Sequence, residues 1–91
     1  MSESPAVEDL VVATIAAVCN LEKAAVTLDT DMLEAGLDSL HIMVLVGQVE
    51  STYGCEVTPE QMVGFFDAPC VRDVVRLVEC IRAGRLILPL S

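Results

Sequence analysis

Apolar residues recur with helical spacing in four segments of the chain, and no segment shows the strict alternation of a strand. The first predicted helix begins at Pro5, a residue suited to a first helical turn, and ends near Asn20. Its apolar face consists of Val7, Leu10, Val11, Thr14, Ile15 and Val18. A single amphipathic helix of this kind must bury its apolar face against other elements.

A long connection, residues 21–38, follows this helix. Residues 29–31 supply side chains that favour turns. Four apolar residues are spaced as anchors that would hold the connection against a core: Leu28, Met32, Leu33 and Leu37. Connections of this length inside a compact domain usually serve a function.

The second predicted helix runs from Ser39 to about Tyr53, with Gly54 as its C-terminal cap. It carries more apolar residues than one buried face needs. We expect one stripe to face the core: Ile42, Leu45, Val46, Val49 and Tyr53. A rotated stripe with the same spacing consists of Leu40, Met43, Val44 and Gly47. Such a helix is either wholly buried or presents its second stripe to a partner.

Two further helices complete the pattern. A short third helix is predicted from Pro59 to Phe66 or Asp67, with Thr58 and Gln61 forming a capping box. The fourth is predicted to begin after Pro69, to end at Ala83, and to be followed by Gly84. Its apolar face consists of Val71, Val74, Val75, Val78 and Ile81. Residues 85–91 form an apolar tail.

Length and composition indicate one small all-α domain. The 91 residues are enough for a single core, and 54% of them are hydrophobic while only 3% are aromatic. The core is therefore expected to be aliphatic. We predict a four-helix bundle that occupies residues 1–91 as a single domain, with its core in about residues 5–84.

Charge and cysteine placement exclude several classes of function. The net charge is −9, and residues 1–70 contain one base, Lys23, so nucleic acid is a poor partner. The four cysteines form no CxxC pair and only one histidine exists, so no metal site is expected. The acidic N-terminus does not resemble a secretory signal, and no apolar run is long enough to span a bilayer. We expect reduced, mostly buried cysteines in a cytoplasmic protein.

Ser39 is the candidate for chemistry because it lies at the mouth of a helix, directly after Asp38. A helix start carries partial positive charge, which would stabilise a phosphate attached there. A helix N-cap is the simpler role for a serine in this place. A serine hydrolase is excluded, because there is no Gly-x-Ser-x-Gly elbow and the one histidine, His41, belongs on another face of the helix.

The segment 29–40 resembles the attachment region of acyl and peptidyl carrier proteins. The residues that carry the resemblance are Asp29, Asp31, Gly36, Leu37, Asp38, Ser39 and Leu40. The order of helix, long loop, motif helix, short helix and final helix extends it over most of the chain. It implies a four-helix bundle of the acyl-carrier type, with a long loop between the first two helices and a short third one.

The resemblance also implies a function without catalysis by the chain itself. Ser39 would accept a 4′-phosphopantetheine arm from coenzyme A, and Asp38 would help to position the serine in the transferase complex. The arm's thiol would hold cargo as a thioester. The implied partners are a phosphopantetheinyl transferase, a cargo-loading ligase or acyltransferase, and downstream biosynthetic enzymes. The residues that fall at the partner-binding face are Leu40, His41, Met43, Val44 and Gly47.

The chain differs from fatty-acid-synthesis carriers in one respect. From Leu40 to Glu50 the only acidic residue is Glu50 itself, so docking should depend on apolar contact more than on charge pairing. This favours a specialised pathway with acyl, polyketide-like or aminoacyl cargo. We expect a free-standing, monomeric carrier. The alternative from the residues alone is a small helical adaptor that binds through the same stripe and has no prosthetic group.

Overall fold

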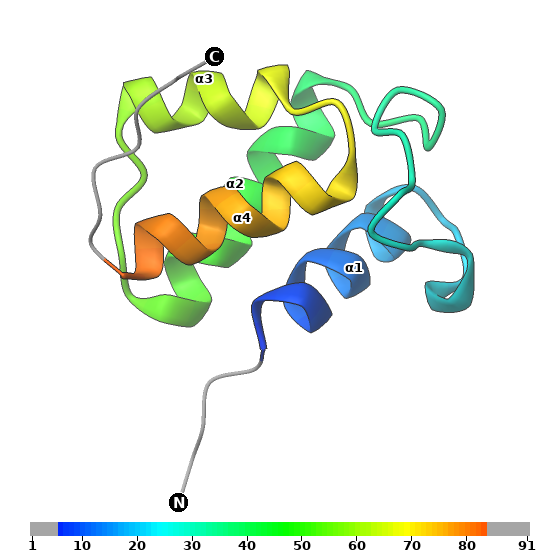
Figure 1. The fold of residues 1–91 in the computed structure, drawn as a ribbon, viewed down its shortest axis with the longest axis horizontal. Helices are drawn as coiled ribbons and strands as arrows, with labels where there is room; N and C mark the ends of the chain where they lie inside the picture. Colours follow the sequence, from blue (N-terminus) through cyan, green and yellow to red (C-terminus); the bar gives the residue numbers. More distant parts are fainter. Residues whose placement is uncertain (1–5, 84–91) are drawn as a thin grey trace, which may run out of the picture.

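The computed structural model describes residues 6–83, which form four α-helices and one short 3-10 turn (Figure 1). The elements in chain order are α1 (Val7–Val18), η1 (Lys23–Ala25), α2 (Ser39–Tyr53), α3 (Pro59–Asp67) and α4 (Val71–Arg82). Helices α1 and α3 each pack against both α2 and α4, so the four helices form a closed ring around one core. The described residues contain no strand, and the predicted all-α class is confirmed.

Local sequence signals determine the end of α2 and the start of α3. Helix α2 has the predicted bounds, and Gly54 ends it in the left-handed conformation, with a φ of 63°. At α3, the Thr58 hydroxyl accepts from the Gln61 N–H while the Gln61 side chain accepts from the Thr58 N–H, which confirms the capping box. The first helix is shorter than predicted, and its expected start, Pro5, lies outside the described residues. The fourth ends one residue before Ala83.

The core is aliphatic, as the composition predicts. One cluster of buried side chains draws on all four helices, and Phe65 is the one aromatic member among the described residues. The expected inner stripe of α2 is buried at Ile42, Leu45, Val46 and Val49, and Tyr53 is partly buried. Of its expected face, helix α1 buries all but Leu10 and Val18, which are partly buried. It also buries Val12 and Ala16, because it contacts two helices instead of one.

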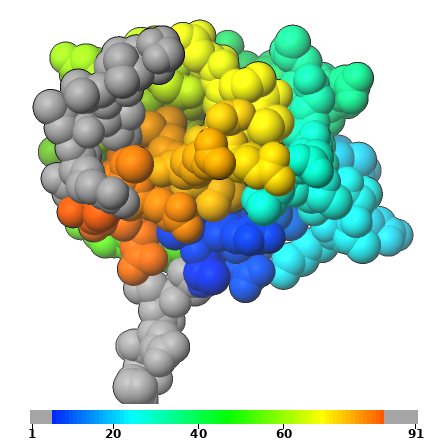
Figure 2. Space-filling model, in the orientation of Figure 1, coloured from blue at the N-terminus to red at the C-terminus, as the bar shows by residue number. Residues whose placement is uncertain are grey.

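The connection between α1 and α2 is held against the start of α4. The N–H groups of Val71 and Arg72 donate to the carbonyls of Thr30 and Leu28, at 3.0 and 2.9 Å. The Met32 N–H donates to the Pro69 carbonyl at 3.0 Å. Figure 2 shows this connection, in cyan, lying directly against the yellow start of α4. The loop carbonyls therefore accept from N–H groups in the first turn of α4, which have no partner within the helix.

Two expectations from sequence are corrected here. Leu33 is not an anchor, because its side chain is 84% exposed, whereas Met32 and Leu37 are buried and Leu28 is partly buried. The four cysteines, expected to be mostly buried, are each only half-buried. Within residues 6–83 no helix has the length and apolar character needed to cross a membrane. The tail, residues 85–91, and Gly84 lie outside the described residues.

Candidate functional site

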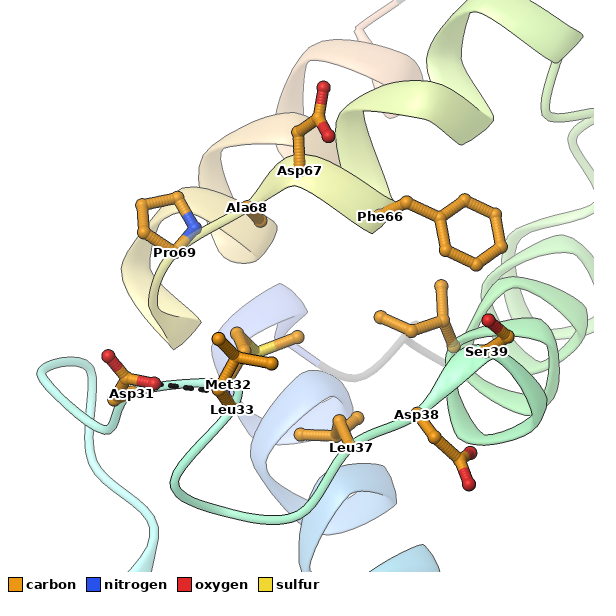
Figure 3. A pocket seen from close by; sticks show the side chains of 11 residues that line it. Asp31, Met32, Leu33, Leu37, Asp38, Ser39, Phe66, Asp67, Ala68 and Pro69 are labelled. Carbon is orange, nitrogen blue, oxygen red and sulfur yellow. Dashed lines mark hydrogen bonds between the residues drawn. The ribbon is translucent and has the colours of Figure 1, made fainter.

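Ser39 is the first residue of α2, and its side chain is exposed. The N-cap is Asp38, whose carboxylate accepts the His41 N–H at 3.0 Å. Ser39 is therefore not the cap, and the simpler role considered for it from sequence is wrong. Figure 3 shows Ser39 beside a cavity, while the Asp38 carboxylate points to the other side of the chain. The serine hydroxyl remains available for chemistry at the positive end of the helix.

His41 completes the cap. Its Nδ1 atom lies 3.4 Å from the Asp38 backbone nitrogen, 3.4 Å from Oδ1 of Asp38 and 3.3 Å from the Gly36 carbonyl oxygen. The imidazole thus occupies the place that Glu or Gln takes in a standard capping box. Sequence reasoning placed His41 on the surface, near the partner-binding face, and missed this contact. Its position three residues after an N-cap aspartate was the available signal.

The hydrogen bonds of the cap hold the pKa of the Asp38 carboxyl below its ordinary value. The largest cause is the hydrogen bond from the His41 backbone N–H, and the His41 side chain adds to it. A carboxylate that accepts backbone N–H groups is stabilised in its ionised form. Asp38 is therefore ionised near neutral pH, and its carboxylate stabilises the N-terminal end of α2.

An open groove with a volume of about 640 Å³ begins at Ser39. The loop forms one wall with Met32 and Leu33, and the opposite wall consists of Phe66 at the end of α3 and Pro69 in the connection to α4 (Figure 3). Ile42 and Leu37 contribute further apolar surface. Asp31, Asp38 and Asp67 also line the groove, although the Asp38 carboxylate points away from it, and no basic residue among residues 6–83 lines it.

Exposed apolar side chains occur on three of the elements that contribute to this site, and two of them, Leu33 and Phe66, line the groove itself. On α2, Leu40, Met43 and Val44 are exposed, and Leu40 is 72% exposed. Leu33 from the loop and Val63 and Phe66 from α3 are exposed as well. We call the α2 residues Leu40, Met43 and Val44 the apolar ridge. Exposure of the ridge excludes a wholly buried α2.

Sequence reasoning found the ridge but not the contributions of α3 and the loop. Val63 and Phe66 follow Pro59 by four and seven residues, so their shared helix face was readable. What could not be read is that Phe66 lines the same groove as Ser39, because α3 is brought to this place by its packing on α2 and α4. Within residues 6–83 no cluster of three or more metal-binding side chains occurs.

Comparison with known proteins agrees with this geometry. The family model described as the phosphopantetheine attachment site matches residues 9–78. The chain is also 35% identical over 69 residues to clavatol synthase claF of Penicillium crustosum. That alignment covers 72% of this chain but 2% of the synthase. An exposed serine at a helix start, beside an open groove, fits a flexible phosphate-linked arm. The chain therefore belongs to the phosphopantetheine-attachment family, whose domains carry 4′-phosphopantetheine and the cargo linked to it.

Proposed function

We propose that Ser39 is the residue that carries the arm, and that the chain delivers thioester cargo to partner enzymes through the apolar ridge. The observation that carries this proposal is the exposed Ser39 hydroxyl at the first residue of α2, bordering the groove. Residues 9–78 contain one other serine, Ser51, which lies near the C-terminal end of α2. The negative end of a helix disfavours a phosphate, so Ser51 is the poorer acceptor.

The modification would convert the phosphoanhydride of coenzyme A into a phosphodiester on the serine. The Ser39 Oγ atom attacks the phosphorus that bears pantetheine in coenzyme A, so an Oγ–P bond forms and the pyrophosphate P–O bond breaks. Adenosine 3′,5′-bisphosphate leaves, and the hydroxyl proton passes to a base of the transferase. The bound arm supplies a thiol that holds an acyl group as a thioester.

This chain's own residues hold the acceptor in place. The Asp38 carboxylate, which points away from the groove, accepts the His41 N–H and so caps α2, and the Ser39 hydroxyl is not needed as a cap. Backbone hydrogen bonds hold the loop against α4. They keep the wall that the loop forms in place, opposite the wall that contains Phe66 of α3. No residue here needs to act as a base, because the carrier is a substrate of other enzymes.

The partners follow from the surface around Ser39. An enzyme that contacts the ridge would already face the arm's attachment point. The ridge has no charged side chain, so docking is expected to rest on apolar contact. We propose a transferase, a loading ligase or acyltransferase, and downstream enzymes of a specialised biosynthetic pathway as partners. The acyl, polyketide-like or aminoacyl nature of the cargo would follow from the loading enzyme.

Intact mass spectrometry tests the attachment residue. Incubation with coenzyme A, magnesium and a broad-specificity phosphopantetheinyl transferase should add one phosphopantetheine to the wild type and to Ser51→Ala, and none to Ser39→Ala. Ser39→Ala should change the unfolding free energy by less than about 0.5 kcal/mol, because Ser39 is exposed and is not the cap. Normal modification of Ser39→Ala would refute the assignment. An unmodified wild type, with a transferase active on another carrier, would refute the carrier function.

A further inference from the structure

Three of the four glycines in residues 6–83 are explained by the fold itself. Gly36 and Gly54 have φ values of 92° and 63°, which side chains rarely adopt. A Cβ atom on Gly64 would approach Leu77 Cδ2 at 3.1 Å, so close packing between α3 and α4 requires a small residue there. Gly47 differs from all of these.

Gly47 lies in the interior of α2, where glycine is less favourable than any residue except proline. A Cβ atom at this position would meet no heavy atom within 4 Å. Neither backbone conformation nor packing within the described residues therefore requires glycine. The residue lowers the stability of α2 without serving the isolated domain.

Gly47 lies next to the apolar ridge on the surface of α2. Gly47 follows Leu40 by seven residues and Val44 by three, so the three share one exposed face of α2. Because Gly47 has no side chain, the helix surface is lower at this position than along the adjoining ridge, and we call this depression the step. The step is eight residues from Ser39, about 12 Å along the helix axis.

We propose that Gly47 forms a docking notch that receives an uncharged, apolar side chain of the phosphopantetheinyl transferase. This inference rests on the proposed modification of Ser39. An interface of ordinary size contributes about 20 to 30 residues from each partner. An enzyme that covers Ser39 with such an interface also covers a position about 12 Å away.

The charges around the notch define the occupant. The face from Leu40 to Gly47 has no acidic or basic residue apart from the His41 imidazole on its flank, and carboxylates mark its two ends at Asp38 and Glu50. A charged side chain buried over this face would lose its hydration without gaining a partner. An apolar side chain matches this pattern, because the carboxylates at the two ends of the face already accept backbone N–H groups, Asp38 from His41 and Glu50 from Val57.

The test separates stability from docking. Gly47→Ala and Gly47→Leu are compared with the wild type and with Gln48→Ala, an exposed residue at the flank of the same ridge, four residues after Val44. Each is measured for its melting temperature and for the KM and kcat of arm addition by a broad-specificity transferase with coenzyme A and magnesium. Gly47→Ala should melt several degrees higher than the wild type. Its KM should rise about threefold, and that of Gly47→Leu tenfold or more, with kcat nearly unchanged.

Each outcome decides the matter. A stepwise rise of KM from Gly47 to Ala to Leu in folded variants, with Gln48→Ala unchanged, supports the notch. An unchanged or lower KM in the Gly47 variants overturns it, and so does an equal rise in Gln48→Ala. A wild type that the transferase does not modify refutes the proposed function itself and not only the notch.

Discussion

At the residue scale, Asp38 supports the start of α2 through its charge and its position. Its carboxylate accepts the His41 N–H, and this hydrogen bond lowers the pKa of Asp38. The same residue is expected from the family resemblance to help position Ser39 in the transferase complex. The structural role and the role in transfer can be separated, because asparagine caps a helix about as well as aspartate but has no charge.

We predict that Asp38→Ala lowers the melting temperature by about 5 °C at pH 7, while Asp38→Asn changes it little. If the charge matters for transfer, both variants lose rate with a transferase, and Asp38→Asn does so without loss of stability. Thermal unfolding and mass spectrometry of the same samples measure the two effects. An Asp38→Asn protein that melts as low as Asp38→Ala would contradict the capping role.

The same carboxylate predicts a pH dependence. Since the pKa of Asp38 is lower in the folded state than in the unfolded state, ionisation stabilises the fold fully above about pH 4. This contribution is lost as the pH falls through the lowered folded-state pKa. The difference in melting temperature between wild type and Asp38→Ala should therefore shrink on acidification. The difference between Asp38→Asn and Asp38→Ala should stay nearly constant.

At the scale of elements, α3 places two adjacent aromatic residues in opposite environments. Phe65 is 0% exposed, and Phe66 is 44% exposed and lines the groove. Phe65→Ala would leave a cavity in the core and should lower the unfolding free energy by about 3–5 kcal/mol. Phe66→Ala should lower it by less than about 1 kcal/mol. Urea unfolding of both variants checks this, and similar losses would show that α3 is rotated from its described position.

At the scale of the whole molecule, the acidic charge is poorly compensated. The net charge is −9, and the ion pair between Arg72 and Asp29, at 2.8 Å, joins two side chains that are exposed. An exposed pair adds little stability, so repulsion among the carboxylates should weaken the fold at low salt. Raising NaCl from 10 to about 150 mM shortens the Debye length from about 30 to 8 Å and should raise the melting temperature by a few degrees. A melting temperature independent of salt would show that the carboxylates are too dispersed to interact.

The sequence by itself determined the features that depend on near neighbours in the chain. The bounds of α2, its glycine cap and the capping box of α3 were all predicted, because such signals act within one helical turn. The two stripes of α2 were predicted from the 3.6-residue period. The family and its prosthetic group were predicted from the residues around Ser39, and the family match to residues 9–78 confirms both. The assignment of the arm to Ser39 stays a prediction.

Only the tertiary structure decided which distant residues meet. It showed that Leu33 lies exposed at the rim of the groove that begins at Ser39, and that Phe66 from α3 lines the same groove. It also showed that Asp38, and not Ser39, is the helix cap. Periodicity gives the face on which a side chain lies but not the neighbour of that face. Which element lies against that face depends on how the four helices close around one core. It also depends on the loop carbonyls that accept from the N–H groups in the first turn of α4.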